Sequence, residues 1–289
     1  MNQFAFLIGA HKTGTTYFNK VLLANLDLLK ESGVYFEASG TVKRELTKYL
    51  NKPLSEGSAN SKLATTREYL FRHKKDFQRL LFSNENISGN IESFKKYKVM
   101  YPNVSSRVKN LNVIFEGEPV DLYFFIRNYS DFIESSYSEY IRNCGYIPFS
   151  KFHATAFENG ACWITVIDNI IDVFPSAHLV VVDNQQLRDH SVDVMNELTS
   201  LKLSEYGRIE KDLGRASLSA HGLEIVQQKN RLRLTRLPAK QVDAIAKKYP
   251  KSKKYGELQL LTPELRNAYD VQYTRDLETL RQRGLLAKI

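Results

Sequence analysis

The sequence of 289 residues predicts an α/β protein of three layers, in which a central, mostly parallel sheet is flanked by helices. Three observations support this fold class. Apolar segments of strand length recur along the chain, the segments between them carry apolar residues at helical spacing, and the first apolar segment ends in a glycine loop that opens a helix. Strands that alternate with helices are typical of parallel sheets covered on both faces.

The first unit is the clearest. Residues 3–9, QFAFLIG, predict a strand that ends at Gly9. A single helix is expected next and should end at Gly33. Its apolar stripe consists of Phe18, Val21, Leu22, Leu26 and Leu29.

The middle of the chain continues the alternation. Residues 40–60 are polar and include Pro53, so they predict a loop, whereas residues 62–78 predict a basic helix. Residues 79–85, RLLFSNE, predict a short buried strand that runs into a polar loop, and residues 92–118 predict a mixture of helix and turn.

The remaining segments follow the same pattern. Strands are expected over 120–127 and 178–183, and helices over 130–142 and 163–174. Thr262-Pro263-Glu264 predicts a helix start, because it offers a capping hydroxyl, a proline in the first turn and an early acid. We expect one domain over 1–289, with its core in 1–190 and a helical portion in 191–289.

Composition limits the class of protein. The longest apolar runs have strand length, so no transmembrane segment is expected. The start of the chain lacks the features of a secretory signal, which favours the cytoplasm. Cys144 and Cys162 are the two cysteines, and so few imply free thiols in a reducing compartment rather than a disulfide framework.

The formal net charge is +9, which favours anionic partners. Between Lys229 and Lys254, ten Lys and Arg residues accompany one acid, Asp243. This stretch predicts either a solvated helical surface or a binding surface for an acidic acceptor. Its two aromatic residues, Tyr249 and Tyr255, are too few to stack single-stranded nucleic acid, so nucleic acid is not an expected partner. Contact with an anionic membrane surface is left open.

The loop after the first strand reads GAHKTGTT, residues 9–16. Gly9 and Gly14 have the spacing of a phosphate-binding loop, but the next two positions hold Thr15 and Thr16, so the usual lysine is absent, and Lys12 lies inside the loop instead. Such a loop presents backbone N–H groups and a helix N-terminus to an anion. A displaced lysine favours a nucleotide with little charge at its transferring end.

KTGTT after a first strand resembles the 5′-phosphosulfate loop of sulfotransferases that use 3′-phosphoadenosine 5′-phosphosulfate (PAPS), and the similarity is greatest to the bacterial, carbohydrate-type branch. The second signature of that family is an arginine at a strand end with a serine eight residues later, here Arg127 and Ser135. The resemblance implies a P-loop-like fold and PAPS as the cofactor, with 3′-phosphoadenosine 5′-phosphate (PAP) as product. It implies that Arg127 and Ser135 bind the 3′-phosphate. The loop residues implied to bind the cofactor are Lys12, Thr13, Gly14, Thr15 and Thr16.

The resemblance also implies a general base, a His or Glu that often follows the second strand. Glu85 is expected at that place, after the segment 79–83. The rivals are Glu37, Glu116 and Glu118, whereas His11 is expected to shape the loop backbone. The cytosolic small-molecule branch of the family has a late KG loop that contacts the 3′-phosphate and the adenine, and this loop has no clear counterpart here. The segment 214–222 could supply it through Arg215 or Ser217. Trp163 is expected in the core.

The expected activity is transfer of a sulfuryl group from PAPS to a hydroxyl, on an acidic or neutral glycan, by in-line displacement and without a metal. Lys12 would offset charge on the leaving phosphate. A P-loop kinase using ATP and magnesium is the alternative enzyme. It would need an acid after a strand as a magnesium partner, and only Asp183 stands at a strand end, where it could equally cap a helix.

A third reading is a non-enzymatic polyanion-binding protein that uses residues 229–254. Neither residues 40–78 nor the C-terminal third contains a motif that identifies the acceptor. No motif indicates the oligomeric state.

Overall fold

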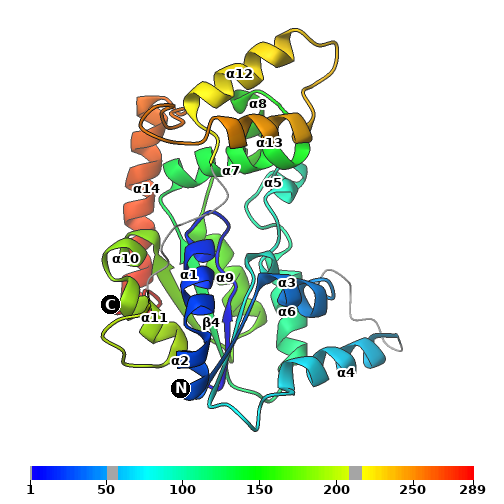
Figure 1. The fold of residues 1–289 in the computed structure, drawn as a ribbon, viewed down its shortest axis with the longest axis vertical. Coiled ribbons are helices and arrows are strands. Elements are labelled where there is room, and N and C mark those ends of the chain that lie inside the picture. The colour runs from blue at the N-terminus through cyan, green and yellow to red at the C-terminus, as the bar shows by residue number, and fades with distance from the viewer. Residues whose placement is uncertain (1, 51–57, 208–216) are drawn as a thin grey trace.

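A computed structural model describes residues 2–50, 58–207 and 217–289. Its centre is a five-stranded, fully parallel sheet with the strand order β2-β3-β1-β4-β5, which confirms the predicted α/β class (Figure 1). The strands are β1 (Phe4–Leu7), β2 (Val34–Ala38), β3 (Arg79–Ser83), β4 (Val120–Ile126) and β5 (His178–Asp183). Because β1 lies between β3 and β4, the loops that follow these three strands lie at one edge of the sheet, where ligands bind in such folds.

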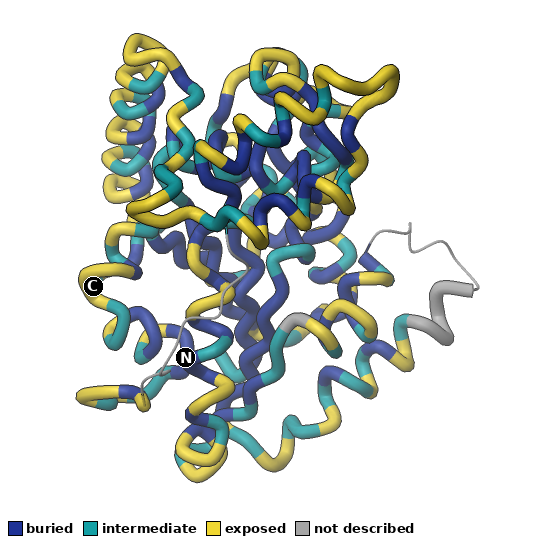
Figure 2. Tube along the Cα trace, turned by 45° about the horizontal axis from the view of Figure 1, so that its top comes forward, coloured by how far each residue is buried: buried dark blue, intermediate teal, exposed yellow. Residues whose placement is uncertain are grey.

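The sheet separates two apolar cores because alternate residues of each strand point to opposite faces. Phe4 and Phe6 of β1 belong to the larger core, whereas Ala5 and Leu7 belong to the smaller one. The larger core includes side chains of α6 (Val104–Ile114), α7 (Tyr129–Cys144), α9 (Trp163–Val173) and α14 (Pro263–Gln282). The smaller one includes side chains of α1 (Thr15–Ala24), α2 (Leu26–Glu31), α10 (Asn184–Asp189) and α11 (Ser191–Thr199). Figure 2 shows the buried strands in the middle of the molecule with exposed chain around them. The three-layer arrangement is therefore present.

The helix predicted after the glycine loop is divided, so the prediction of a single helix up to Gly33 is wrong. α1 (Thr15–Ala24) ends at Asn25, and α2 (Leu26–Glu31) begins after it. The side-chain amide of Asn25 donates to the carbonyl of Val21 at 2.7 Å, and its oxygen accepts from the N–H of Gly207 at 2.8 Å. A partner 182 residues away thus stabilises the break.

Two further predictions need correction. β2 was not predicted as a strand, so the segment 79–83 is the third strand and not the second. Residues 40–47, part of the predicted loop 40–60, belong to α3 (Ser39–Val42) and a π-helical turn η1 (Lys43–Thr47), because Val42 and Leu46 are spaced to bury on one side. Pro53 lies outside the described residues.

The other helices agree broadly with the predictions. They are α4 (Ser58–Phe71), the 3₁₀ turn η2 (Glu85–Ile87), α5 (Glu92–Tyr97), α6 (Val104–Ile114), α7 (Tyr129–Cys144), α8 (Phe149–Ala156), α9 (Trp163–Val173) and α10 (Asn184–Asp189). The basic helix predicted over 62–78 ends earlier, at Phe71.

In the described ranges 191–207 and 217–289 the regular elements are helices: α11 (Ser191–Thr199), α12 (Ala220–Arg231), α13 (Ala239–Lys248) and α14 (Pro263–Gln282). The predicted start at Thr262 is confirmed, since its hydroxyl accepts from the N–H of Leu265 and Pro263 begins the helix. α12 and α13 lie with α7 and α8 at one end of the molecule (Figure 1).

Two smaller predictions are also settled. Cys144 and Cys162 are free thiols, as expected. Within the described ranges, no helix combines the length and the apolar character that crossing a bilayer requires.

Candidate functional site

The backbone on both sides of Gly9 holds the glycine loop against β4. The N–H of Ile8 donates to the carbonyl of Tyr123, and that of Ala10 to the carbonyl of Phe125, both at 3.0 Å. A Cβ on Gly9 would lie 2.6 Å from the backbone nitrogen of Phe125. Only glycine therefore allows this approach between the loop and β4.

The loop turns through two residues in the left-handed region. Lys12 has φ 64° and Gly14 has φ 99°. The hydroxyl of the buried Thr13 donates to the carbonyl of Ala10 at 2.6 Å, and the amide of Asn184 donates to the carbonyl of Thr13 at 2.9 Å. Such alternation of backbone conformation brings successive N–H groups together into an anion-binding concavity.

Gly14 is the N-cap of α1, and no side chain caps this helix end. The first N–H groups of a helix have no partner within the helix. Thr15 and Thr16 therefore present backbone N–H donors, and the exposed Thr16 adds a hydroxyl. This helix end has the donors that a phosphate group requires.

Arg127 connects the end of β4 to this loop. Its Nη1 donates to the carbonyl of Lys12 at 3.1 Å, and its Nη2 contacts Asp131 at 3.0 Å. Its Nε is buried and has no hydrogen-bond partner among the described residues. The indole N–H of Trp163 donates to the Arg127 carbonyl at 2.8 Å and fixes the backbone there. Trp163 itself is fully buried, as predicted.

Arg127 and Ser135 line one cavity of about 340 Å³. Ser135 comes from α7, one helix later in the chain, so the spacing read from the sequence brings the two side chains to one site. Lys251, Arg266 and Ser217 line the same cavity. Ser217 was one of the two residues expected to complete the 3′-phosphate and adenine site, and the other, Arg215, lies outside the described residues.

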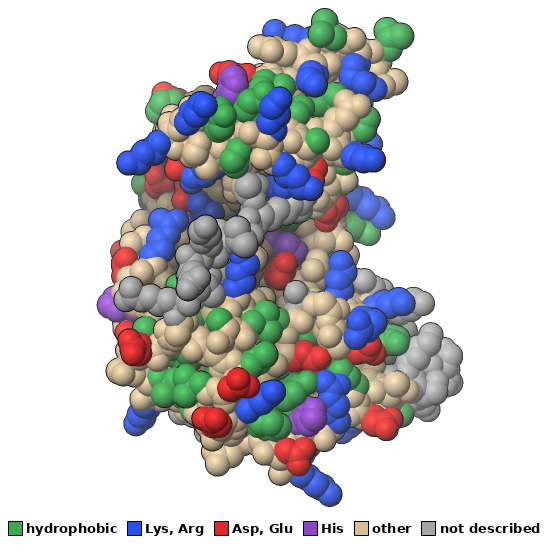
Figure 3. All heavy atoms as spheres, viewed as in Figure 1, with side chains coloured by type: hydrophobic (Ala, Val, Ile, Leu, Met, Phe, Trp, Pro, Cys, Tyr) green, Lys and Arg blue, Asp and Glu red, His purple; other side chains and the backbone are tan. Residues whose placement is uncertain are grey.

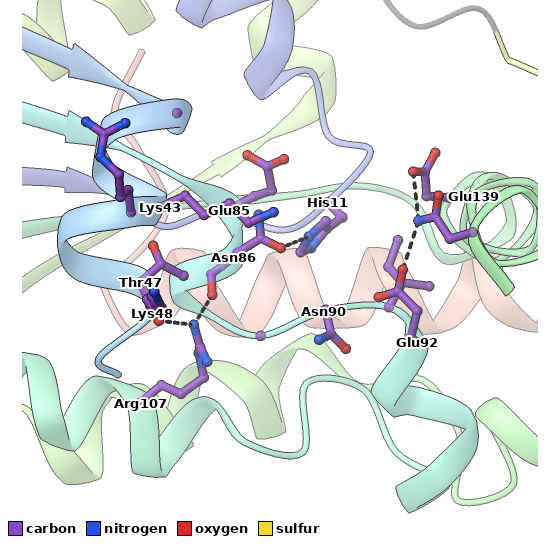
Figure 4. Close-up of a pocket in the computed structure, with 15 residues that line it drawn as sticks. His11, Lys43, Thr47, Lys48, Glu85, Asn86, Asn90, Glu92, Arg107 and Glu139 are labelled. Atoms are coloured by element: carbon purple, nitrogen blue, oxygen red, sulfur yellow. Dashed lines mark hydrogen bonds between the residues drawn. The ribbon is translucent and has the colours of Figure 1, made fainter. Parts of the chain in front are cut away.

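A second cavity of about 680 Å³ lies on the other side of the glycine loop. Figure 4 shows His11, Glu85 and Asn86 on its wall, Lys43 and Lys48 on one side, and Glu139 and Glu92 on the other. Figure 3 shows the recess between the helical end and the sheet, with histidine and acidic side chains visible in it. Glu85 therefore faces a cavity with room for a ligand.

Lys12 contacts one residue of each cavity, since its carbonyl accepts from Arg127 of the smaller one and its ammonium pairs with Glu139 of the larger one. The Nζ of Lys12 is 3.7 Å from a carboxylate oxygen of Glu139, and both side chains are mostly buried. Glu139 lies one turn after Ser135 in α7, so neighbouring turns of this helix face the smaller and the larger cavity. Lys12 is thus placed between the proposed phosphate sites and the larger cavity.

His11 is part of a hydrogen-bond network. Its N–H donates to the hydroxyl of Tyr101 at 2.7 Å, while its ring contacts the same hydroxyl at 3.2 Å and the Asn86 side chain at 3.4 Å. Burial lowers the pKa of His11 and raises that of Tyr101, so both are neutral near pH 7. The network holds the loop in place, in agreement with a backbone-shaping role for His11.

The rival carboxylates are engaged elsewhere. Glu37 pairs with Arg72 at 2.8 Å, and Glu118 pairs with Lys74 at 2.5 Å. Glu116 is exposed. Asp183 forms the capping box of α10 with Gln186 and accepts a hydrogen bond from Tyr273.

Glu85 differs from these groups. It is half buried, and its carboxylate has no hydrogen bond or ion pair within residues 2–50, 58–207 and 217–289. Glu85 follows the third strand, β3, and not the second strand, so the expected place after the second strand is wrong. Its place in the larger cavity, beside His11, now supports Glu85 as the candidate base.

Sequence reasoning missed Glu139, Asn86 and Tyr101. Glu139 could have been found from Ser135, since residues four apart lie on one helix face. Tyr101 gives no such signal, because its partner His11 is 90 residues away.

No family model and no curated protein matches this chain in sequence comparison.

Proposed function

We propose that this chain is a PAPS-dependent sulfotransferase that transfers a sulfuryl group to a hydroxyl, on a carbohydrate or glycan. One observation carries the proposal. Arg127 hydrogen-bonds the carbonyl of Lys12 and shares a cavity with Ser135, so the glycine loop and the pair from the second signature form one site.

The residues fit the two phosphate groups of the cofactor. The uncapped end of α1 offers N–H donors and the helix dipole to a 5′-phosphate. The unpartnered Nε of Arg127 and the hydroxyl of Ser135 suit a 3′-phosphate. PAPS would supply the sulfuryl group, and its 5′-phosphate would leave with the bridging oxygen as PAP.

Lys12 and Glu85 take the catalytic roles in this proposal. Lys12 places its ammonium between the two cavities, where it would offset the charge that develops on the leaving oxygen. Glu85 would accept the proton of the acceptor hydroxyl, since its carboxylate lies in the larger cavity and is not engaged by another described residue. Glu139 would position Lys12.

The larger cavity supports a polar acceptor. Carboxylates, amides and cations line it, and a glycan offers hydroxyl groups to such a wall. Lys43 and Lys48 would also accommodate an acidic group of the glycan. The free thiols agree with the reducing, cytoplasmic compartment that we propose.

The proposal is tested by incubating the protein with PAPS and a panel of glycans, and by measuring PAP release and the mass gain of the acceptor. We expect Lys12→Ala and Arg127→Ala to lower turnover by about 10²-fold or more. Lys30→Ala, which changes an exposed lysine of α2, is the matched control and should keep full turnover. Unchanged turnover in both site variants, or turnover that requires ATP and magnesium, would contradict it.

A further inference from the structure

The loop between α12 and α13 exposes two leucines. Leu232 is 88% exposed and Leu234 is 107% exposed, whereas the next most exposed large apolar side chain among the described residues, Leu23, is 47% exposed. Full exposure of two neighbouring large apolar side chains is unfavourable in water. It is typical of a surface that contacts an apolar phase.

The exposure belongs to an anchored loop. Leu237, three residues after Leu234, is buried, and its N–H donates to the side chain of Asn230 at 2.8 Å. Its carbonyl accepts from the N–H of Tyr146 at 2.9 Å. The two ends of the loop are therefore fixed to α12 and to the chain after α7, and its tip projects from the end of the molecule (Figure 1).

Cations surround the two leucines. Arg231, Arg233 and Arg236 are all exposed and alternate with them or flank them. The one acid of the stretch 229–254, Asp243, already contacts Arg142 at 2.7 Å and Lys247 at 2.9 Å. Basic side chains are prominent at this end of the molecule in Figure 3. The surface therefore has a strong positive potential around an apolar tip.

We propose that this loop docks the protein on an anionic lipid membrane, with Leu232 and Leu234 inserted among the lipids and the arginines on the headgroups. A basic surface alone would fit any polyanion, including nucleic acid. The leucines favour lipid, because insertion into an apolar phase stabilises them and a phosphodiester backbone does not. The proposal does not depend on the sulfotransferase activity.

The test is co-sedimentation of the full chain with phosphatidylcholine vesicles that contain phosphatidylserine. We expect the chain to bind these anionic vesicles and to bind vesicles of pure phosphatidylcholine much more weakly. Leu232→Ser/Leu234→Ser should weaken it about tenfold or more. Arg231→Gln/Arg233→Gln should weaken it about tenfold and reduce its salt dependence.

Leu28→Ser/Leu265→Ser is the matched control. It removes two exposed leucines that lie in α2 and α14, away from the loop, and should leave binding unchanged. Thermal melting of each variant shows that it is folded. No binding of the wild-type chain to anionic vesicles would overturn the proposal. Equal binding by the leucine variant, together with tight binding to polyuridylate, would overturn it in favour of a soluble polyanion.

Discussion

Three carboxylates line the larger cavity, Glu85, Glu92 and Glu139, and the surroundings of Glu85 and Glu139 differ. Glu139 contacts Lys12 at 3.7 Å and accepts from the amide of Asn143 at 3.2 Å, whereas Glu85 has no such partner among the described residues. A carboxylate that accepts a proton must reach the acceptor hydroxyl with a free lone pair. Within the proposed mechanism, these surroundings favour Glu85 for proton transfer and Glu139 for positioning Lys12.

Glu85→Gln should lower kcat by about 10²- to 10⁴-fold while PAP binding is unchanged. The rate is measured by PAP release at saturating acceptor, and PAP binding by titration calorimetry. Glu139→Gln is the matched comparison. It should loosen the position of the Lys12 ammonium and lower kcat less than Glu85→Gln does. If Glu85→Gln retains full turnover, the assignment of the base is wrong even where PAPS is the donor.

His11 makes stability depend on pH. Its pKa in the folded protein is lowered by burial below the value near 6.5 that it has in the unfolded chain. Below about pH 6.5 the unfolded chain therefore binds more protons than the folded protein. The free energy of unfolding decreases as the pH falls through this range. At higher pH this contribution is complete.

His11→Gln should reduce the loss of stability between pH 7 and pH 5.5, as measured by urea unfolding at each pH. His153 also has a lowered pKa and remains in both proteins, so the difference between the two curves isolates His11. Parallel curves for wild type and variant would show that His11 is not protonated more readily on unfolding.

At the scale of elements, the start of α1 carries the proposed phosphate site. Gly14→Ala places a side chain at φ 99°, although the nearest atom, the Cδ1 of Leu187, would be 3.4 Å away. The backbone must shift, so we expect a loss of about 1 kcal/mol in stability and a clear loss of PAP affinity. Gly117→Ala is the matched control, because φ there is 81° with open space around it. It should lose stability and keep PAP affinity.

The elements also show what sequence can predict. β1, β3, β4 and β5 were predictable because they are nearly continuous apolar runs. β2 was missed, since its residues Tyr35 and Glu37 are polar and lie at the sheet edge. The break at Asn25 depends on Gly207, and no local pattern contains that contact.

The site divides in the same way. The proposed cofactor side was predictable, because Lys12 and Arg127 follow strands and Ser135 lies in the next helix. Its larger cavity was not, since residues 39–47, 85–92 and 139–143 meet there through tertiary packing alone.

At the scale of the whole molecule, α13 is attached to α7 by an ion pair. Arg142 is 1% exposed in its side chain and contacts Asp243 at 2.7 Å. Asp243→Ala would leave a buried guanidinium without this partner, and we expect a loss of about 2–3 kcal/mol in the free energy of unfolding. Glu158→Ala breaks the exposed pair with Lys98 and should cost less than about 1 kcal/mol. Equal losses in urea unfolding would contradict the attachment.

The cofactor class is the central claim, and a thermal-shift measurement of the wild-type chain tests it most directly. Ligand that binds only the folded state at about 100 times its Kd stabilises it by about 2.7 kcal/mol. We predict that PAP raises Tm by about 4–8 °C. We further predict that ATP with magnesium does not raise it, and that Arg127→Lys loses most of the shift. A shift with ATP and magnesium but none with PAP would contradict the account.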